Sequence, residues 1–303
     1  MSTIALPPSA ETERIEQPGR FVRVMRYLRR NKGLAVGVLI LLGLTAFTLI
    51  GLMTINPKHA YPLSAALKKP PSLRYPFGTD FFGRDLYAAM VVGMWQTAVI
   101  GLLAGGVGTL IGVVFGFISA YFSGKIDFTI RTVCQILTPI PILLIQVVIA
   151  GSLDKRDVTI LTMAMIVVLL AWMGPTLVIR SQVLTMKERQ FVAVAKLSGV
   201  SDFGIIFKEI LPCLLPFIAA AFVAQVFAAV FASFYLAVLG LGPLREPLLG
   251  NLIWAAQSQG AFFNGWWWWP IIPSIAMILI LGSLALINMG LDELANPRVR
   301  RTE

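Results

Sequence analysis

Six long apolar runs, separated by shorter polar segments, set the hydropathy pattern of this chain of 303 residues. The runs cover residues 34–53, 95–121, 132–152, 158–179, 213–241 and 268–291. A helix needs about 20 apolar residues to cross a hydrocarbon core of roughly 30 Å, so each run predicts one transmembrane helix. The pattern therefore predicts an all-α membrane protein with six transmembrane helices.

The composition agrees, since 57% of the residues are hydrophobic and only 13% are charged, too few to cover a soluble domain. The run at 34–53 is too long for the core of a signal peptide, and we expect a retained span. Seventeen of the 25 Lys and Arg residues fall on the side of the amino terminus and eight on the other side. This bias predicts that both termini are cytoplasmic. The net charge of +10 then reflects contact with membrane lipid, and we expect no nucleic-acid partner.

Several kinds of chemistry find no support in the sequence. A Gly-rich phosphate loop of the Walker type is missing, and the single histidine, His59, has no partners for a metal site or a catalytic triad. The spans hold almost no acidic residues, whereas ion-driven carriers usually bury ionisable groups there. Gln146 and Gln225 are the candidate polar groups for lining a pathway, although such amides more often join two helices. We therefore expect the driving force to come from another molecule.

A polar island separates the fourth and fifth runs. Its residues 187–198 place Phe191, Val194 and Ala195 on one side of an amphipathic helix. Gly199 is a natural helix stop, and Ser201 or Asp202 can cap a second short helix at 203–210. Pro212 suits the first turn of the next span. These features favour a rigid knob for a soluble partner and a plain loop on the membrane surface about equally.

This island resembles the "EAA" loop of permease subunits in ABC importers. The spacing matches at Ala195, Gly199, Leu211 and Pro212, whereas Ala193, Val194 and Glu209 replace the usual Glu, Ala and Ile. The resemblance implies that this coupling loop, residues 187–212, docks two short helices in a groove of an ATPase subunit. The site residues that it implies are Ala193, Ala195, Gly199, Ser201, Asp202, Phe203, Leu211 and Pro212.

Two further stretches narrow the resemblance. Residues 77–85, Phe-Gly-Thr-Asp-Phe-Phe-Gly-Arg-Asp, resemble a signature of the second permease subunit in dipeptide and oligopeptide importers. We call these residues the FGTD motif and expect its two glycines to form tight turns. We expect the motif to be a structural cap on the bundle more than a substrate contact. The residues of this cap are Gly78, Thr79, Asp80, Gly83, Arg84 and Asp85. Residues 236–243 and 291–298 resemble two later motifs of the same family, so that the resemblance covers roughly residues 22–300.

The resemblance implies the type I permease fold of ABC importers in the cell inner membrane. It divides the chain into a cytoplasmic segment 1–33 with an amphipathic lead-in, a first span 34–53, an extracytoplasmic segment 54–94, a core of five spans 95–291 and a cytoplasmic tail 292–303. The implied partners are a homologous permease, two ABC ATPase subunits and an extracytoplasmic binding protein. The chain itself would be no enzyme and would bind no cofactor, since the partner ATPases use ATP and Mg.

Peptides are the substrates that the resemblance implies first, with oligosaccharides, opines and nickel chelates as alternatives. The alternative from another class of transport protein is a stand-alone channel or a secondary carrier. Pro139 and Pro141 predict a kink in the third span, and Pro175 predicts one in the fourth. The run Trp266–Trp269 is typical of an aromatic anchor at the membrane interface, and a platform for stacking on sugars is the alternative.

Overall fold

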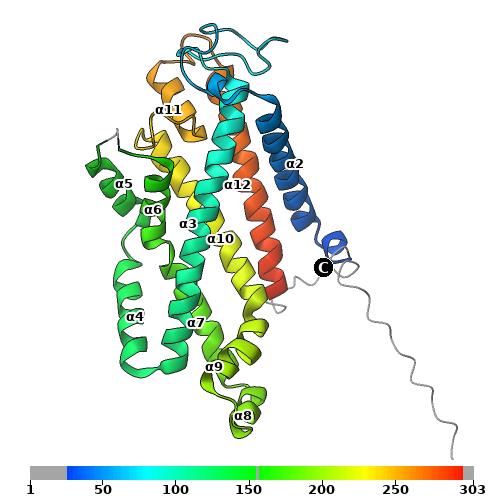
Figure 1. The fold of residues 1–303 in the computed structure, drawn as a ribbon, viewed down its shortest axis with the longest axis vertical. Coiled ribbons are helices and arrows are strands. Elements are labelled where there is room, and N and C mark those ends of the chain that lie inside the picture. Colours follow the sequence, from blue (N-terminus) through cyan, green and yellow to red (C-terminus); the bar gives the residue numbers. More distant parts are fainter. Residues whose placement is uncertain (1–25, 155–156, 296–303) are drawn as a thin grey trace, which may run out of the picture.

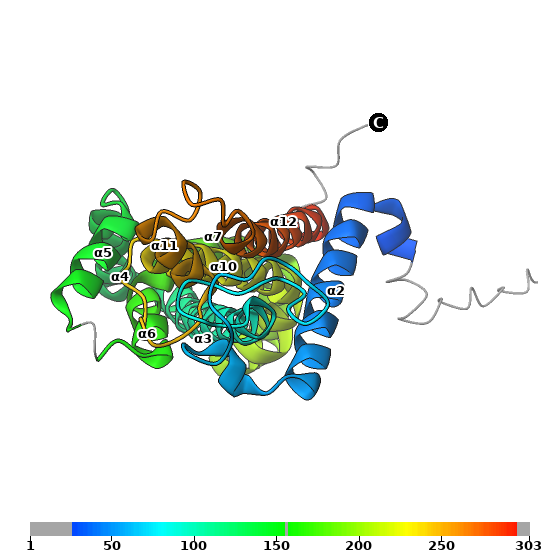
Figure 2. The same cartoon turned by 90° about the horizontal axis from the view of Figure 1, so that it is seen from above.

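A computed structural model describes residues 26–154 and 157–295 of the chain. In these ranges the regular secondary structure consists of helices, joined by loops that include one isolated bridge between Thr79 and Asp85. The helices form an elongated bundle, with α8 and α9 at one end and α11 at the other (Figure 1). Viewed along the bundle, α2 lies at one edge and α4, α5 and α6 at the opposite edge (Figure 2). Most of the predicted amino-terminal segment 1–33 and most of the predicted tail 292–303 lie outside the described residues.

The elements follow in this order: α2 (Lys32–Thr54), η1 (Pro57–Ala60), α3 (Leu86–Phe122), α4 (Gly124–Leu137), α5 (Ile142–Ser152), α6 (Ile160–Ala171), α7 (Met173–Lys187), α8 (Gln190–Leu197), α9 (Asp202–Gly204), η2 (Ile205–Ile210), α10 (Leu211–Val238), α11 (Leu249–Ser258) and α12 (Trp268–Ala295). Within the described ranges, five helical stretches are long and apolar enough to cross a membrane, or six if the bent pair α4 and α5 forms one span. The six-span prediction therefore agrees with the upper count.

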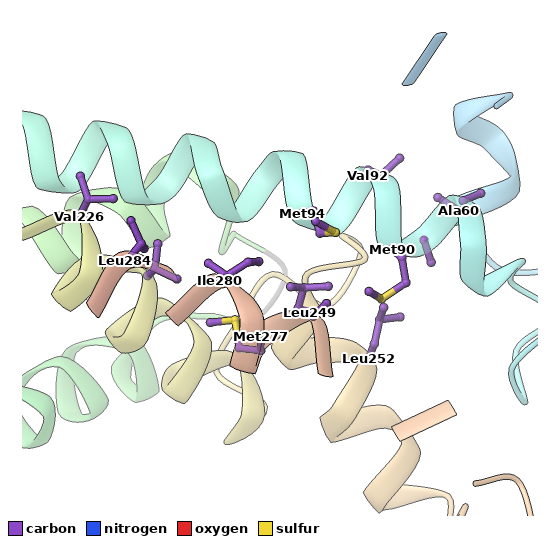
Figure 3. Packing of buried hydrophobic residues seen from close by; sticks show 14 residues of the cluster. Ala60, Met90, Val92, Met94, Val226, Leu249, Leu252, Met277, Ile280 and Leu284 are labelled. Atoms are coloured by element: carbon purple, nitrogen blue, oxygen red, sulfur yellow. The ribbon is translucent and has the colours of Figure 1, made fainter. Parts of the chain in front are cut away.

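Helix α3 is the central element and packs against α6, α7 and α10. It begins at Leu86, nine residues earlier than the predicted span at 95, so the predicted boundary is wrong. The additional turns are buried because Leu86, Met90 and Met94 pack under the loops and α11 at that end. Figure 3 shows Met90 and Met94 meeting Leu249, Leu252 and Met277 from α11 and α12.

Glycines along α3 let its neighbours approach closely, as small residues do between membrane helices. A Cβ atom on Gly105 would lie 2.7 Å from the backbone nitrogen of Val226 in α10. A Cβ atom on Gly112 would lie 2.9 Å from the carbonyl oxygen of Trp172. Because backbone atoms cannot move aside as side chains can, these glycines fix the spacing between α3 and its neighbours.

Gly105 and its neighbour Gly106 offer a matched pair of alanine variants. We expect Gly105→Ala to lower the stability of the purified protein by about 2 kcal/mol, because the added methyl group overlaps backbone atoms of α10. Gly106→Ala should be neutral or stabilising, since its Cβ would meet only the Phe222 ring at 3.8 Å and alanine favours helix. Thermal unfolding in detergent compares the two, and equal melting temperatures would contradict the close approach.

The predicted third span at 132–152 is broken. It consists of α4, which already begins at Gly124, and α5, and the two helices meet at an angle of 78°. The break covers residues 138–141 and contains Pro139 and Pro141. Neither proline has an N–H group for a helical hydrogen bond, and each ring crowds the preceding turn. The two prolines therefore produce a full corner in place of the predicted kink.

The fourth span bends less. Helices α6 and α7 are interrupted only at Trp172, and together they run from Ile160 to Lys187. Pro175 lies in the first turn of α7, where its missing N–H would have bonded the carbonyl of Ala171. The side-chain amide of Gln225, on α10, donates a hydrogen bond to that carbonyl instead. Gln225 thus satisfies the backbone group that Pro175 leaves free.

Candidate functional site

The coupling loop forms a compact knob at one end of the bundle (Figure 1). Helix α7 continues to Lys187, and α8 begins only at Gln190, so the predicted helix at 187–198 is too long at its start. Gly199 ends α8 with φ +77°, and the N–H groups of Gly199 and Val200 bond the carbonyls of Lys196 and Ala195. This is a Schellman motif, the left-handed helix end that favours glycine.

The second predicted helix, at 203–210, is not a separate element. Ser201 caps its start by accepting a hydrogen bond from the N–H of Gly204, but the helix then continues through η2 into α10. Residues 205–210 form a π-helical segment, in which the N–H of Leu211 bonds the carbonyl of Ile206. The wider turn removes the clash that Pro212 would otherwise make with the carbonyl four residues earlier. Pro212 therefore lies inside a continuous helix.

One side of the knob packs against the bundle. Val192 and Ala195 of α8 are buried against Ile205 and Ile206 of η2, and against Val183 of α7. The sequence predicted Phe191 and Val194 on the apolar side, yet both are exposed. The exposed large apolar side chains of the coupling loop are Phe191, Val194, Leu197, Val200, Phe203 and Phe207, with Leu197 exposed by 90%. The knob thus presents apolar groups that nothing in the described chain covers.

Tyr121, near the end of α3, ties the knob to the bundle. Its hydroxyl donates a hydrogen bond of 2.5 Å to the Asp202 carboxylate, at the start of α9. Lys187 donates to the carbonyl of Tyr121 at 2.9 Å, and its ammonium group lies 5.3 Å from the centre of the Tyr121 ring. Hydrogen bonds to charged groups are among the stronger ones in proteins. The start of α9 and the end of α7 are therefore fastened to the same turn of α3.

A second polar contact lies beside it. Arg180 of α7 donates two hydrogen bonds to the carboxylate of Asp127 in α4, at 2.5 and 2.7 Å, and Ser119 of α3 donates to the same carboxylate. A bidentate pair of this kind fixes direction as well as distance. The sequence analysis did not predict a role for Tyr121, Asp127 or Arg180. Asp127 and Arg180 are charged residues beside apolar runs, and this position could have indicated that they form a contact.

The FGTD motif lies at the opposite end of the bundle. Gly78 and Gly83 have φ +75° and +72°, as the predicted turns require. Asp80 accepts hydrogen bonds from the N–H groups of Phe82 and Arg84, at 2.9 and 2.8 Å. Asp85 caps α3 by accepting from the N–H of Tyr87 at 2.9 Å. The motif is therefore a folded cap, and its polar groups point mainly at its own backbone.

The tryptophan run holds this cap in place. The Trp268 indole donates a hydrogen bond of 3.2 Å to the carbonyl of Thr79, and a Cβ atom on Gly78 would lie 2.8 Å from the Trp268 ring. Trp269 is fully buried, and Trp266 packs against Phe81. Only Trp267 is exposed by more than half. The sequence was interpreted most simply as an aromatic anchor at the membrane interface. That interpretation suits Trp267, but not Trp268 and Trp269, which pack inside the protein.

Asp80 and Arg84 form a buried ion pair, with 3.7 Å between Arg84 Nε and Asp80 Oδ2. Burial raises the pKa of Asp80 and lowers the pKa of Arg84, so desolvation opposes both charges. Removing one charge leaves the other buried alone, and we expect Asp80→Asn to lower the stability by about 3 kcal/mol. The double variant Asp80→Asn/Arg84→Met should recover most of that loss. Melting temperatures measure both, and a double variant less stable than Asp80→Asn would contradict the argument.

The two candidate pathway residues lie on different helices, α5 and α10. Gln146 lies on α5, is 2% exposed, and its amide oxygen has no hydrogen-bond partner in the described chain. Gln225 lies on α10 and lines a cavity between α7, α10 and α12. The hydrogen bond from Gln225 to Ala171 gives this residue a structural role at the same time. Among the described residues, no group of three His, Cys, Asp or Glu could hold a metal ion.

Comparison with known proteins identifies the class. Residues 112–301 match the family described as "Binding-protein-dependent transport system inner membrane component", and the chain belongs to this family. It is thus a multi-pass protein of the inner membrane, a permease subunit of an ABC transporter and not an enzyme, and the transport system in which it works depends on a binding protein.

Several peptide permeases match this chain over almost all of its length. The dipeptide transport system permease protein DppC of Bacillus subtilis is 29% identical, over 91% of this chain and 85% of its own length. The oligopeptide transport system permease protein OppC of Bacillus subtilis is 27% identical, over 91% and 89%. OppC of Mycobacterium tuberculosis is 28% identical, over 93% and 95%. The chain is therefore similar to this group of permeases from end to end.

Proposed function

We propose that this chain forms half of the translocation pathway of an ATP-driven peptide importer, and that its knob receives the motion of an ATPase subunit. The observation that carries the proposal is the exposed apolar surface of the coupling loop, held rigidly on α3 through Tyr121 and Lys187. Exposed apolar patches rimmed by polar groups are typical of protein interfaces. The site residues Ala193, Gly199 and Phe203 lie on this knob.

The proposed orientation follows from the basic residues. Seventeen of the 25 Lys and Arg residues fall on the side that holds the coupling loop, which would then face the cytoplasm and the ATPases. The FGTD motif would face outward, toward a binding protein. A homologous permease would complete the pathway, and two ABC ATPase subunits would bind ATP and Mg, so that this chain needs no cofactor of its own.

Transmission would work as a rigid-body movement. From Asp202 to Val238 the helix is continuous, so a push on its start reaches the far end of the bundle. The contacts of Tyr121 and Arg180 connect the same push to α3, α4 and α7. Alternation between two arrangements of the paired permeases would then open the pathway to one side at a time.

Peptides are the proposed substrates because the relatives named above are peptide permeases. Oligosaccharides, opines and nickel chelates are the other substrates that this machinery would serve, and the binding protein would select among them. No observation favours the stand-alone channel or the secondary carrier. A channel or a secondary carrier would transport its substrate without ATP, whereas the proposed importer would need ATP, so the ATP dependence of uptake distinguishes them.

The test is purification of the tagged chain from its native membrane in mild detergent, followed by mass spectrometry. We expect recovery of a second permease, one or two kinds of P-loop ATPase and a binding protein. The purified complex in vesicles should take up short peptides only when ATP is supplied. Recovery of the chain alone, together with uptake that does not need ATP, would overturn the proposal in favour of a channel or carrier.

A further inference from the structure

The cavity beside Gln225 differs in its chemistry from two larger cavities of the described chain. It has a volume of about 300 Å³ and lies between α7, α10 and α12. Its walls are mostly small or apolar, with Gly174 and Val178 from α7 and Ala224 from α10. Three polar side chains interrupt them, namely Gln225, Asn288 and Asp292. Two larger cavities on the membrane-spanning helices have linings that are almost entirely apolar.

The charges of this cavity are one-sided. Asp292 brings a carboxylate, which accepts hydrogen bonds but donates none while it is ionised. No Lys, Arg or His lines the cavity, and no basic side chain in residues 26–154 or 157–295 forms an ion pair with Asp292. Within the described ranges, the side-chain hydrogen bond to this carboxylate comes from the Asn288 amide, at 3.4 Å. The cavity therefore favours a cation.

The amides add acceptors to the same cavity. The oxygen of Asn288 is buried and accepts no hydrogen bond from the described chain. A buried polar atom without a partner is unfavourable by about 1–3 kcal/mol, which a donor from an entering molecule would offset. Gln225 uses one of its N–H groups on the Ala171 carbonyl, which holds its side chain at the wall. Carboxylate, amide oxygen and a fixed second amide together suit a small group with several N–H donors.

We infer that this cavity binds the protonated amino group of the transported molecule on its way toward the coupling-loop end of the bundle. The inference rests on the proposed function, and the amino terminus of a peptide is such a group. Asp292 supplies the opposite charge, and Asn288 accepts a hydrogen bond.

The test probes the cavity directly, in the purified complex in lipid nanodiscs. A single cysteine at Ala224→Cys, with Cys134 and Cys213 replaced by alanine, reacts with cationic 2-aminoethyl or anionic 2-sulfonatoethyl methanethiosulfonate. We expect the cationic reagent to react about tenfold faster than the anionic one. Asp292→Asn should bring the two rates close together, and Asp292→Glu should keep the preference.

A matched control is the neighbouring carboxylate. Glu293 accepts a hydrogen bond from Asn31 at 2.7 Å and does not line the cavity, so Glu293→Gln should leave the preference unchanged. A tripeptide with a free amino terminus should slow the cationic reagent, whereas its N-acetylated form should not. Equal rates for the two reagents, or equal protection by both peptides, would overturn the inference. Absence of peptide uptake in the same preparation would instead overturn the proposed function.

Discussion

The variant Gly199→Val will insert into the membrane and assemble with its partners, but it will transport almost nothing. Gly199 has φ +77°, a conformation that a β-branched residue adopts only under strain. Apart from its two chain neighbours, no described residue has an atom within 4 Å of the position of its Cβ, so the defect comes from the backbone and not from a clash. We expect the valine to break the Schellman motif and to change the angle between α8 and α9. Peptide uptake per ATP hydrolysed in reconstituted vesicles should fall by at least about tenfold.

The control for this variant is Gly199→Asn, because asparagine tolerates the left-handed region far better than valine. It should keep most of the uptake while filling the same open space. Normal coupling in the valine variant would remove the basis for a rigid lever at this helix end. Equal loss in both variants would mean that the space at this position, and not its backbone angle, is needed for docking.

In the variant Tyr121→Phe, the amount of peptide transported per ATP hydrolysed will fall several-fold, while the fold is retained. The ring still packs among Val183 and Ile205, and only the hydroxyl that bonds Asp202 is removed. A hydrogen bond to a charged group contributes about 1.5–3 kcal/mol, enough to release the start of α9 from α3 for part of the time. Transport and ATP hydrolysis, measured on the same vesicles, give the ratio.

Tyr235→Phe is the matched control. Tyr235 lies on α10, and its hydroxyl makes no hydrogen bond within the described ranges. Its removal should leave the ratio of transport to hydrolysis unchanged. An unaltered ratio in Tyr121→Phe as well would place the transmission elsewhere, and the Arg180–Asp127 pair would be the next contact to remove.

Hydropathy predicted six spans, which agrees with the upper count of the structure, and the glycines at 78, 83 and 199 predicted the positions where the chain turns with positive φ. The ends of the helices were harder to predict. The early start of α3 depends on burial under α11. The sequence placed Pro212 in the first turn of a new helix, whereas the π-helical turn before it lets the helix continue through the proline.

The polar contacts of the knob were out of reach for another reason. Ser119, Asp127 and Arg180 belong to three different helices, and Tyr121 lies 81 positions from Asp202. A single sequence gives the charge of each residue but not its neighbour in space. Two prolines predicted a break between α4 and α5. The angle of 78° between these helices also depends on how α4 packs against α3 and α5 against α6, which the sequence does not give.

The contact between Trp268 and Thr79 has a consequence for biosynthesis. Trp268 begins the last helix of the chain, whereas Thr79 precedes the second long one, and 189 positions separate them. During synthesis the FGTD motif lacks its contact with Trp268 until α12 has been inserted. A chain that stops before α12 therefore keeps Gly78, Phe82 and Leu86 uncovered. The cap can therefore reach its final packing only after α12 has been inserted.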